Sequence, residues 1–348
     1  MSARLGRIGA LDAARGVAIL GMLYAHAAPV LGTSPLPVKA LAAATQVTAP
    51  LFVVLAGMSI GLMTGGAEPP ASGAERRAMR LQQLRRAVAL VVIGVLLWWI
   101  GSPIAVVIDS IGIVLLLAIP LLFCPRAVIA GVGAAALVLS PLAQGWAASP
   151  DVVVFLTGNP VLERLASWLV AGPHYWALLF LPFLAAGLVA ARTDLRRSSA
   201  PGRLAAAGGI GVLAGAAVGA WGGMSIHPGS TTVAGNLVAL GCALLVIAAL
   251  LQIERLPATA GLVGRWNPLV AAGRMPLTVY SLQIILFEAA RPWVDVTDSW
   301  LFLGAITAFL LVIAWSWRRW APFSDGSGPL ELLVARVSGR GSTKRVFV

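Results

Sequence analysis

The chain has 348 residues, of which 59% are hydrophobic and only 11% are charged, and its mean hydropathy is +0.90. Soluble domains carry roughly 25% of their residues as Asp, Glu, Lys and Arg, so this composition excludes a protein that exposes its whole surface to water. The net charge of +12 would in another context indicate a nucleic-acid partner. Here the basic residues lie between apolar runs of about 20 residues, the length that spans a bilayer. We therefore expect a multi-pass protein of the cell membrane, in contact with membrane lipids and without a nucleic-acid partner.

Apolar runs separated by turn and charge breaks predict an all-α fold, a polytopic bundle of about ten transmembrane helices. The predicted spans lie near residues 8–31, 38–63, 87–101, 103–123, 127–147, 172–191, 204–224, 232–252, 270–292 and 299–317. We expect this bundle to occupy residues 1–317 and a basic cytoplasmic tail to follow at residues 318–348. Two less apolar stretches, residues 150–170 and 257–275, are interpreted as candidates for segments that lie along the membrane interface.

The distribution of the cations predicts the orientation of the bundle. If the N-terminus is cytoplasmic, most of the 25 Lys and Arg residues fall in segments on the cytoplasmic side, as the positive-inside rule requires. Both termini are therefore expected to be cytoplasmic. The two cysteines, Cys124 and Cys242, lie in separate apolar runs, which provides neither a disulfide framework nor a metal site.

The first predicted helix contains charged residues that are costly inside a membrane, at about 2.5 to 3.5 kcal/mol each on insertion scales. Asp12 and Arg15 are three residues apart, which makes them neighbours that neutralise each other. His26 follows Arg15 by about three helical turns and falls on the same face, about 16 Å further along the helix. A histidine there is suited to deprotonate a hydroxyl or an amine near neutral pH. The alternative is that Asp12 and Arg15 only anchor the helix at the interface, and that His26 caps its outer end.

Other polar residues lie in or near predicted spans. Asp109 falls in the middle of the fourth predicted helix, where it requires a counter-ion, and an arginine from another helix is the natural one. Candidates for contact with a substrate are Gln46, Asp109, His174, His227 and Gln283. The alternative for the two histidines is an ordinary place at the interface or in a loop. For the hydroxyl groups of the second helix, such as Ser59, the alternative is a hydrogen bond to their own helix.

No Gly-rich phosphate-binding loop occurs in the sequence, so recognition of a phosphate-bearing cofactor would depend on arginines near the cytoplasmic helix ends. The candidates for contact with a cofactor are Arg15, Arg85, Arg274 and Ser59. For most such arginines the alternative is a role in topology and contact with anionic lipids. Arg274 differs because it begins a span and has polar neighbours.

The pattern Arg7-Ile8-x-x-Leu11-Asp12-x-x-Arg15-Gly16, followed by His26, resembles the first helix of the transmembrane acyltransferase superfamily. This superfamily includes heparan-α-glucosaminide N-acetyltransferase and acyltransferase family 3, and the spacing from Arg15 to His26 is similar to that in family 3. The stretch from Pro50 to Ser59 resembles the N-acetyltransferase branch. The patterns Gly273-Arg274-Met275-Pro276-Leu277-Thr278-x-Tyr280 and Gly328-Pro329-Leu330-Glu331 resemble bacterial YeiB-like membrane proteins.

The resemblance implies transfer of an acyl group, in the first place acetyl, from cytoplasmic acyl-CoA to an extracytoplasmic glycan or glycolipid, without a metal. It implies that His26 is the base or acyl relay, that Asp12 and Arg15 orient the helix mouth or contact CoA, and that Arg274 faces the cofactor. Two departures bear on the acceptor. Gln46 stands where the N-acetyltransferase branch has Asp, and Gln283 stands where many YeiB-like chains have His.

Two other classes of function remain open at this point. Sparse charges inside the membrane also fit a transporter or flippase for a lipid-linked or anionic solute, although no inverted repeat of the Asp-x-x-Arg motif is evident. A scaffolding membrane protein is the third class, and its basic tail would contact the membrane surface or a partner. The sequence is also compatible with a homo-oligomer.

Overall fold

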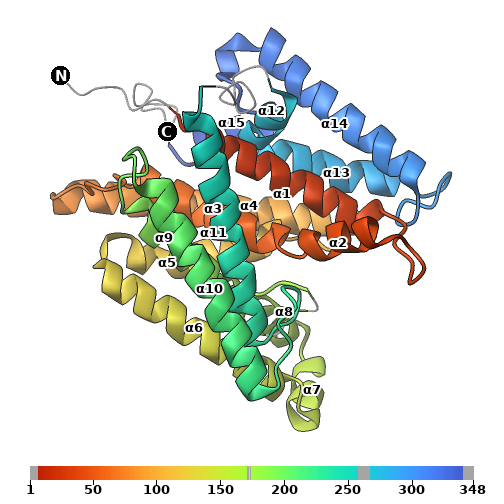
Figure 1. Cartoon of the computed structure of the whole chain (residues 1–348), viewed down its shortest axis with the longest axis horizontal. Helices are drawn as coiled ribbons and strands as arrows, with labels where there is room; N and C mark the ends of the chain where they lie inside the picture. Colours follow the sequence, from red (N-terminus) through yellow and green to blue (C-terminus); the bar gives the residue numbers. More distant parts are fainter. Residues whose placement is uncertain (1–6, 171, 173, 258–266, 340–348) are drawn as a thin grey trace.

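The computed structural model describes residues 7–170, 172, 174–257 and 267–339, and every regular element among them is a helix (Figure 1). The α-helices are α1 (Gly9–Ala27), α2 (Leu36–Thr45), α3 (Thr48–Met63), α4 (Gly73–Trp98), α5 (Ile108–Ala118), α6 (Arg126–Ala147), α7 (Pro150–Thr157), α8 (Pro160–Leu169), α9 (Ala177–Ala191), α10 (Ala200–Gly222), α11 (Val233–Arg255), α12 (Pro268–Arg274), α13 (Pro276–Ala290), α14 (Trp300–Trp320) and α15 (Pro329–Val337). Two 3-10 helices, η1 (Ile119–Phe123) and η3 (Pro322–Ser324), accompany them.

Several of these helices are long and apolar enough to cross a membrane. Within the described residues there are six such stretches: Leu36–Met63, which joins α2 to α3, and the helices α4, α6, α10, α11 and α14. The pair α12 and α13 adds a seventh if the two helices form one bent span, and two shorter apolar stretches are Ile108–Phe123 and Ala177–Ala191. The prediction of an all-helical fold with several helices able to span a membrane is thereby confirmed for the described residues.

Two of the predicted helices are interrupted in the structure. The helix expected at 38–63 divides into α2 and α3 at Gln46 and Val47. The helix expected at 270–292 divides into α12 and α13 at Met275, where the chain bends by 95°. Pro276 explains the second break, because proline has no N–H for the preceding helix and disfavours helical backbone in the residue before it.

The less apolar stretches form short helices or lie outside the described residues. Residues 150–170 form α7 and α8, neither of which is long enough to span a membrane. Of residues 257–275, the segment 258–266 lies outside the described residues, and 268–274 form α12.

The central helices approach one another closely at glycines. Gly57 of α3 packs against the backbone of Leu184 in α9, and Gly187 of α9 packs against the backbone of Val54 in α3, so neither place has room for a Cβ. Small residues are the usual device for close helix packing inside membranes, where dispersion contacts replace the hydrophobic driving force. The same pair of helices therefore lies at the core of the bundle, where Phe183 of α9 is fully buried.

Replacement of Gly57 by Ala is expected to lower thermal stability, because the added methyl group meets a backbone oxygen that cannot rotate away. The expected cost is about 1 to 3 kcal/mol, measured as a lower midpoint of thermal unfolding in detergent. Gly209→Ala is the matched control, since Gly209 lies inside α10 with nothing within 4 Å of an added Cβ. Equal midpoints for the two variants would contradict this packing account.

Arginines gather at one end of the bundle, which we call the basic end and define by Arg126, Arg192 and Arg255. The buried guanidinium of Arg192 donates to the carbonyl oxygens of Gly61, Thr64, Gly66 and Leu122, and Arg126 donates to the Arg192 carbonyl. Arg255 donates to the carbonyls of Leu195 and Ser198. These bonds join the ends of α3, α9, α11 and the start of α6 at one level.

Candidate functional site

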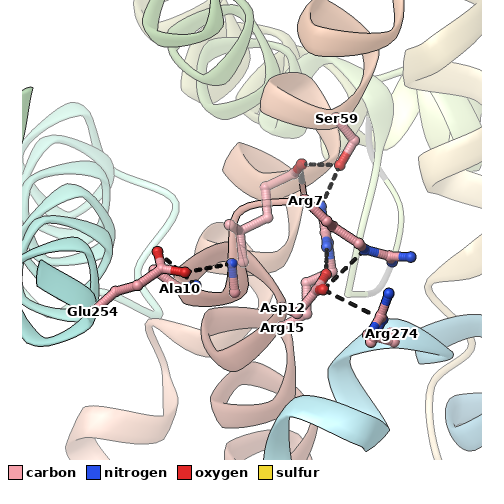
Figure 2. A network of polar contacts seen from close by, with 9 residues as sticks. Arg7, Ala10, Asp12, Arg15, Ser59, Glu254 and Arg274 are labelled. Carbon is pink, nitrogen blue, oxygen red and sulfur yellow. Dashed lines mark hydrogen bonds and ion pairs between the residues drawn. The ribbon is translucent and has the colours of Figure 1, made fainter. Parts of the chain in front are cut away.

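The first turns of α1 carry a buried carboxylate that three arginines surround (Figure 2). Asp12 is 2% exposed. Its Oδ1 accepts from Arg15 Nη1 at 2.5 Å, and its Oδ2 lies 2.9 Å from Arg7 Nε and 3.7 Å from Arg274 Nε. Arg15 Nη2 also donates to Ser59 Oγ at 2.7 Å. We call these five residues, Arg7, Asp12, Arg15, Ser59 and Arg274, the Asp12 cluster.

Three elements bring the cluster together. α1 supplies Asp12 and Arg15, α3 supplies Ser59, and the last residue of α12 supplies Arg274. α12 can approach α1 because Gly273 lies directly on the Asp12 carbonyl and leaves no room for a Cβ. A residue with a side chain at position 273 would push Arg274 away from the carboxylate.

The N-terminus of α1 is fixed at the basic end by an acidic side chain from α11. Glu254 accepts from the backbone N–H of Gly9 at 2.7 Å and of Ala10 at 3.2 Å, as Figure 2 shows. A carboxylate at a helix N-terminus satisfies N–H groups that have no partner within the helix. Because Glu254 adjoins Arg255, this contact places the start of α1 and the Asp12 cluster at the basic end.

The charge of the cluster suits an anion. Arg7, Arg15 and Arg274 each form an ion pair with the carboxylate of Asp12, and their side chains are 28%, 15% and 14% exposed. The excess of guanidinium groups over carboxylates, at low solvent exposure, provides directional N–H donors for phosphate oxygens.

His26 lies in the last turn of α1, at the opposite end of the helix from Asp12, and is half-buried. α1 is continuous over this length, so the spacing of Arg15 and His26 keeps them on one face, about 16 Å apart along the axis. The exposed His174 is near enough to interact with His26 electrostatically. α1 thus carries the Asp12 cluster near its first turn and His26 in its last turn.

Asp109 belongs to a second polar cluster, in the first turn of α5 rather than in mid-helix as predicted. Its Oδ2 accepts from Trp168 Nε1 at 2.9 Å and from Arg164 Nη2 at 3.2 Å. Arg164 in turn lies over the rings of Trp98 and Trp168, at 4.8 and 4.9 Å from their centroids. The expectation of an arginine partner from another helix is confirmed, and the partner comes from α8.

The remaining candidates lie in three separate places. Gln46 is exposed, and its Oε1 adjoins Gly229 in the loop that holds the exposed His227, whose Nδ1 accepts from Gly229 N–H at 3.1 Å. Gln283 is fully buried in α13, and among the described residues neither end of its amide has a hydrogen-bond partner. Arg85 is exposed beside Gly339 after α15 instead of within the Asp12 cluster.

Sequence reasoning missed Glu254, Arg164 and Trp168, and named Arg7 only as part of the motif at the first helix, without a contact to Asp12. The pairing of Asp12 with Arg15 was open to prediction because it lies within one helix turn. The others are contacts between helices far apart in the chain, for which the sequence carries no local signal.

Among the described residues, no group of three or more His, Cys, Asp or Glu side chains is placed to hold a metal ion.

Comparison with known families identifies the family of the chain. Residues 8–318 match the family described as an acyltransferase domain, that of acyltransferase family 3. No curated protein matches the chain. The matched region begins just before α1 and ends within α14, so that it contains the whole Asp12 cluster except Arg7, and also His26. Since the match covers most of its length, the chain belongs to acyltransferase family 3, as a membrane protein with an acyltransferase domain.

Proposed function

We propose that this protein transfers an acyl group, in the first place acetyl, from cytoplasmic acyl-CoA to a hydroxyl or amine of an extracytoplasmic glycan or glycolipid. The observation that carries the proposal is the arrangement on α1. The Asp12 cluster offers guanidinium groups to an anion at one end, and His26 stands at the other end of the same helix. A CoA whose phosphates bind the cluster would extend its pantetheine arm along α1 toward His26.

In this proposal His26 accepts the proton of the acceptor hydroxyl as the oxygen attacks the thioester carbonyl. A tetrahedral oxyanion forms, the C–S bond then breaks, and the CoA thiolate leaves with the proton that His26 returns. The helices around α1 exclude water, which protects the thioester from hydrolysis. No metal takes part in these steps.

The acceptor side is proposed to include Gln46, Asp109, His174, His227 and Gln283. Trp98 and Trp168 beside Arg164 support a polar ligand with an apolar face, such as a sugar, since such rings pack on apolar surface while polar groups around them hydrogen-bond. Gln283 supports it further, because a buried amide with no hydrogen-bond partner among the described residues calls for a polar ligand or water.

We further propose that about ten helices cross the membrane with both termini cytoplasmic. The gathering of Arg126, Arg192 and Arg255 at one end supports this, since cytoplasmic ends carry the excess of Lys and Arg. The start of α1 lies at that end, through Glu254, and the donor site would then face the cytoplasm where acyl-CoA is found.

Acetyl-CoA is expected to raise the thermal unfolding midpoint of the purified protein in detergent, because a ligand that binds only the folded state stabilises it, by about 2.7 kcal/mol at 100 times Kd. Arg274→Gln should weaken this shift, since it removes one guanidinium of the Asp12 cluster. Arg203→Gln, an exposed arginine in the first turn of α10, is the control of equal charge loss. If neither acetyl-CoA nor a longer acyl-CoA shifts the wild-type midpoint, a transporter becomes the better account.

A further inference from the structure

The C-terminal segment that follows α14 contacts the bundle at the bend between α12 and α13. Arg274 ends α12, Met275 is the joint, and Pro276 begins α13 after a turn of 95°. Met275 provides no side-chain cap for α13. The N–H groups of Leu277 and Thr278, in the first turn of α13, therefore find no hydrogen-bond acceptor in the side chain of the N-cap residue.

Glu331 of α15 supplies what the start of α13 lacks. Its Oε1 accepts from the N–H of Leu277 at 2.6 Å and of Thr278 at 3.2 Å, and its Oε2 accepts from the Thr278 hydroxyl at 2.6 Å. That hydroxyl oxygen accepts in turn from Leu330 N–H at 3.1 Å. The carboxyl group therefore acts as a helix cap from another part of the chain, at the end where the helix dipole favours negative charge.

Two glycines let this segment lie against the bend. Gly326 has φ +78°, a left-handed conformation that glycine adopts readily, and it lies on the guanidinium of Arg274. Gly328 lies on the Thr278 hydroxyl with no room for a Cβ. Trp317 Nε1 donates to the Ser327 carbonyl at 2.9 Å, which ties the turn to the end of α14. The segment thus contacts the residues on both sides of Met275.

The bend affects the site because Arg274, a member of the Asp12 cluster, is the last residue of α12 and directly precedes Met275. Arg274 reaches Asp12 at 3.7 Å only while α12 rests on α1 through Gly273. The direction in which α13 leaves the joint decides how α12 can lie, and Glu331 fixes the first turn of α13.

We propose that Glu331 is a positioning residue, which holds the α12–α13 bend so that Arg274 stays at the Asp12 cluster. Residues 326–331, which we call the clasp, would in this way keep the proposed acyl-CoA site in its shape. Glu331 lies beyond the family match, which ends at residue 318. The clasp would therefore be a part of the donor site that the acyltransferase domain alone does not contain. The proposal rests on the proposed function in one respect, that the Asp12 cluster binds acyl-CoA.

Glutamine, the neutral isostere of glutamate, is expected to cap α13 in place of Glu331. Burial raises the pKa of the Glu331 carboxyl, and the hydrogen bonds from Thr278 and Leu277 lower it by less. Glu331→Gln keeps an oxygen for the two N–H groups and removes the cost of a buried charge. Glu331→Ala removes every acceptor and leaves the start of α13 uncapped.

The test compares these variants by hydrogen exchange and by acetyl-CoA binding in detergent. We expect Glu331→Ala to speed exchange both in the first turn of α13 and across α12, and to raise the Kd for acetyl-CoA about tenfold, the equivalent of 1.4 kcal/mol. Glu331→Gln should stay near wild type in both measurements. Arg336→Gln, an exposed residue of the same helix, is the matched control and should change neither.

Thr278→Val keeps the side-chain shape, removes the hydroxyl, and serves if Glu331→Ala fails to fold. Its effects on exchange and on Kd should have the same direction as those of Glu331→Ala and be smaller, because it removes only one of the three hydrogen bonds that Glu331 accepts. Faster exchange confined to α13, with α12 and Kd unchanged, would show a helix cap without a positioning role and overturn the proposal. If wild-type protein binds no acetyl-CoA, the proposed function fails, and exchange across α12 still decides whether Glu331 holds the bend.

Discussion

Replacement of His26 by Ala is expected to lower acyl transfer by about 10² to 10⁴, the usual contribution of a positioned general base. The chain would keep its affinity for acetyl-CoA, because His26 lies at the opposite end of α1 from the Asp12 cluster. The measurement is incorporation of radiolabelled acetyl groups into the glycan and lipid fractions of membrane vesicles, with the thermal shift by acetyl-CoA determined in parallel.

Lys39→Ala is the control for this experiment, since Lys39 is an exposed residue of the neighbouring helix α2. It should leave both acetyl transfer and the thermal shift unchanged. Full transfer by the His26→Ala protein would remove His26 from the mechanism. Loss of transfer together with loss of the thermal shift would instead indicate that the substitution disturbs the fold of α1.

Replacement of Asp12 by Ala is expected to have the largest effect on stability. It leaves Arg7, Arg15 and Arg274 facing one another around a site that is 2% exposed. Removal of one partner from a buried ion pair costs about 3 to 5 kcal/mol, because the remaining charge stays buried without compensation. The midpoint of thermal unfolding and the yield of monodisperse protein in detergent report this loss.

Asp194→Ala is the matched control, because Asp194 forms an ion pair with Arg197 at 3.6 Å on the surface, where its side chain is 45% exposed. Such a pair contributes about 0 to 1 kcal/mol. The double variant Asp12→Ala with Arg274→Gln should recover part of the lost stability, since it also removes one of the opposed cations. Equal losses for Asp12→Ala and Asp194→Ala would refute the view of Asp12 as the centre of a buried cluster.

The two kinds of polar contact in this protein differ in how far a sequence can predict them. Asp12 and Arg15 are three residues apart on one helix, so helical geometry alone places them together. For Asp109 the cost of a buried charge predicts that an arginine must approach. Which arginine approaches is decided by the packing of α8 on α5, and this packing brings Arg164 and Trp168 to the carboxylate.

The helix boundaries show the same division. Apolar runs predict where chain can enter a membrane, because the cost of burial depends on local composition. The break at Met275 depends on Pro276, which is visible in the sequence, whereas the contacts that other parts of the chain make with the 95° bend are not. Those contacts come from Glu331 and the glycines beside it, more than fifty residues further along the chain.

The sequence by itself determined that this chain is a helical membrane protein, that Asp12 pairs with Arg15, and that His26 shares their helix. Each of these follows from composition or from spacing within one helix, where the backbone sets the geometry. Only the tertiary structure decided that Arg7 and Arg274 complete the Asp12 cluster, that Glu254 caps α1 and that Glu331 caps α13. Such contacts depend on how distant helices pack, and that packing is settled by shape and buried charge across the whole bundle rather than by any local pattern.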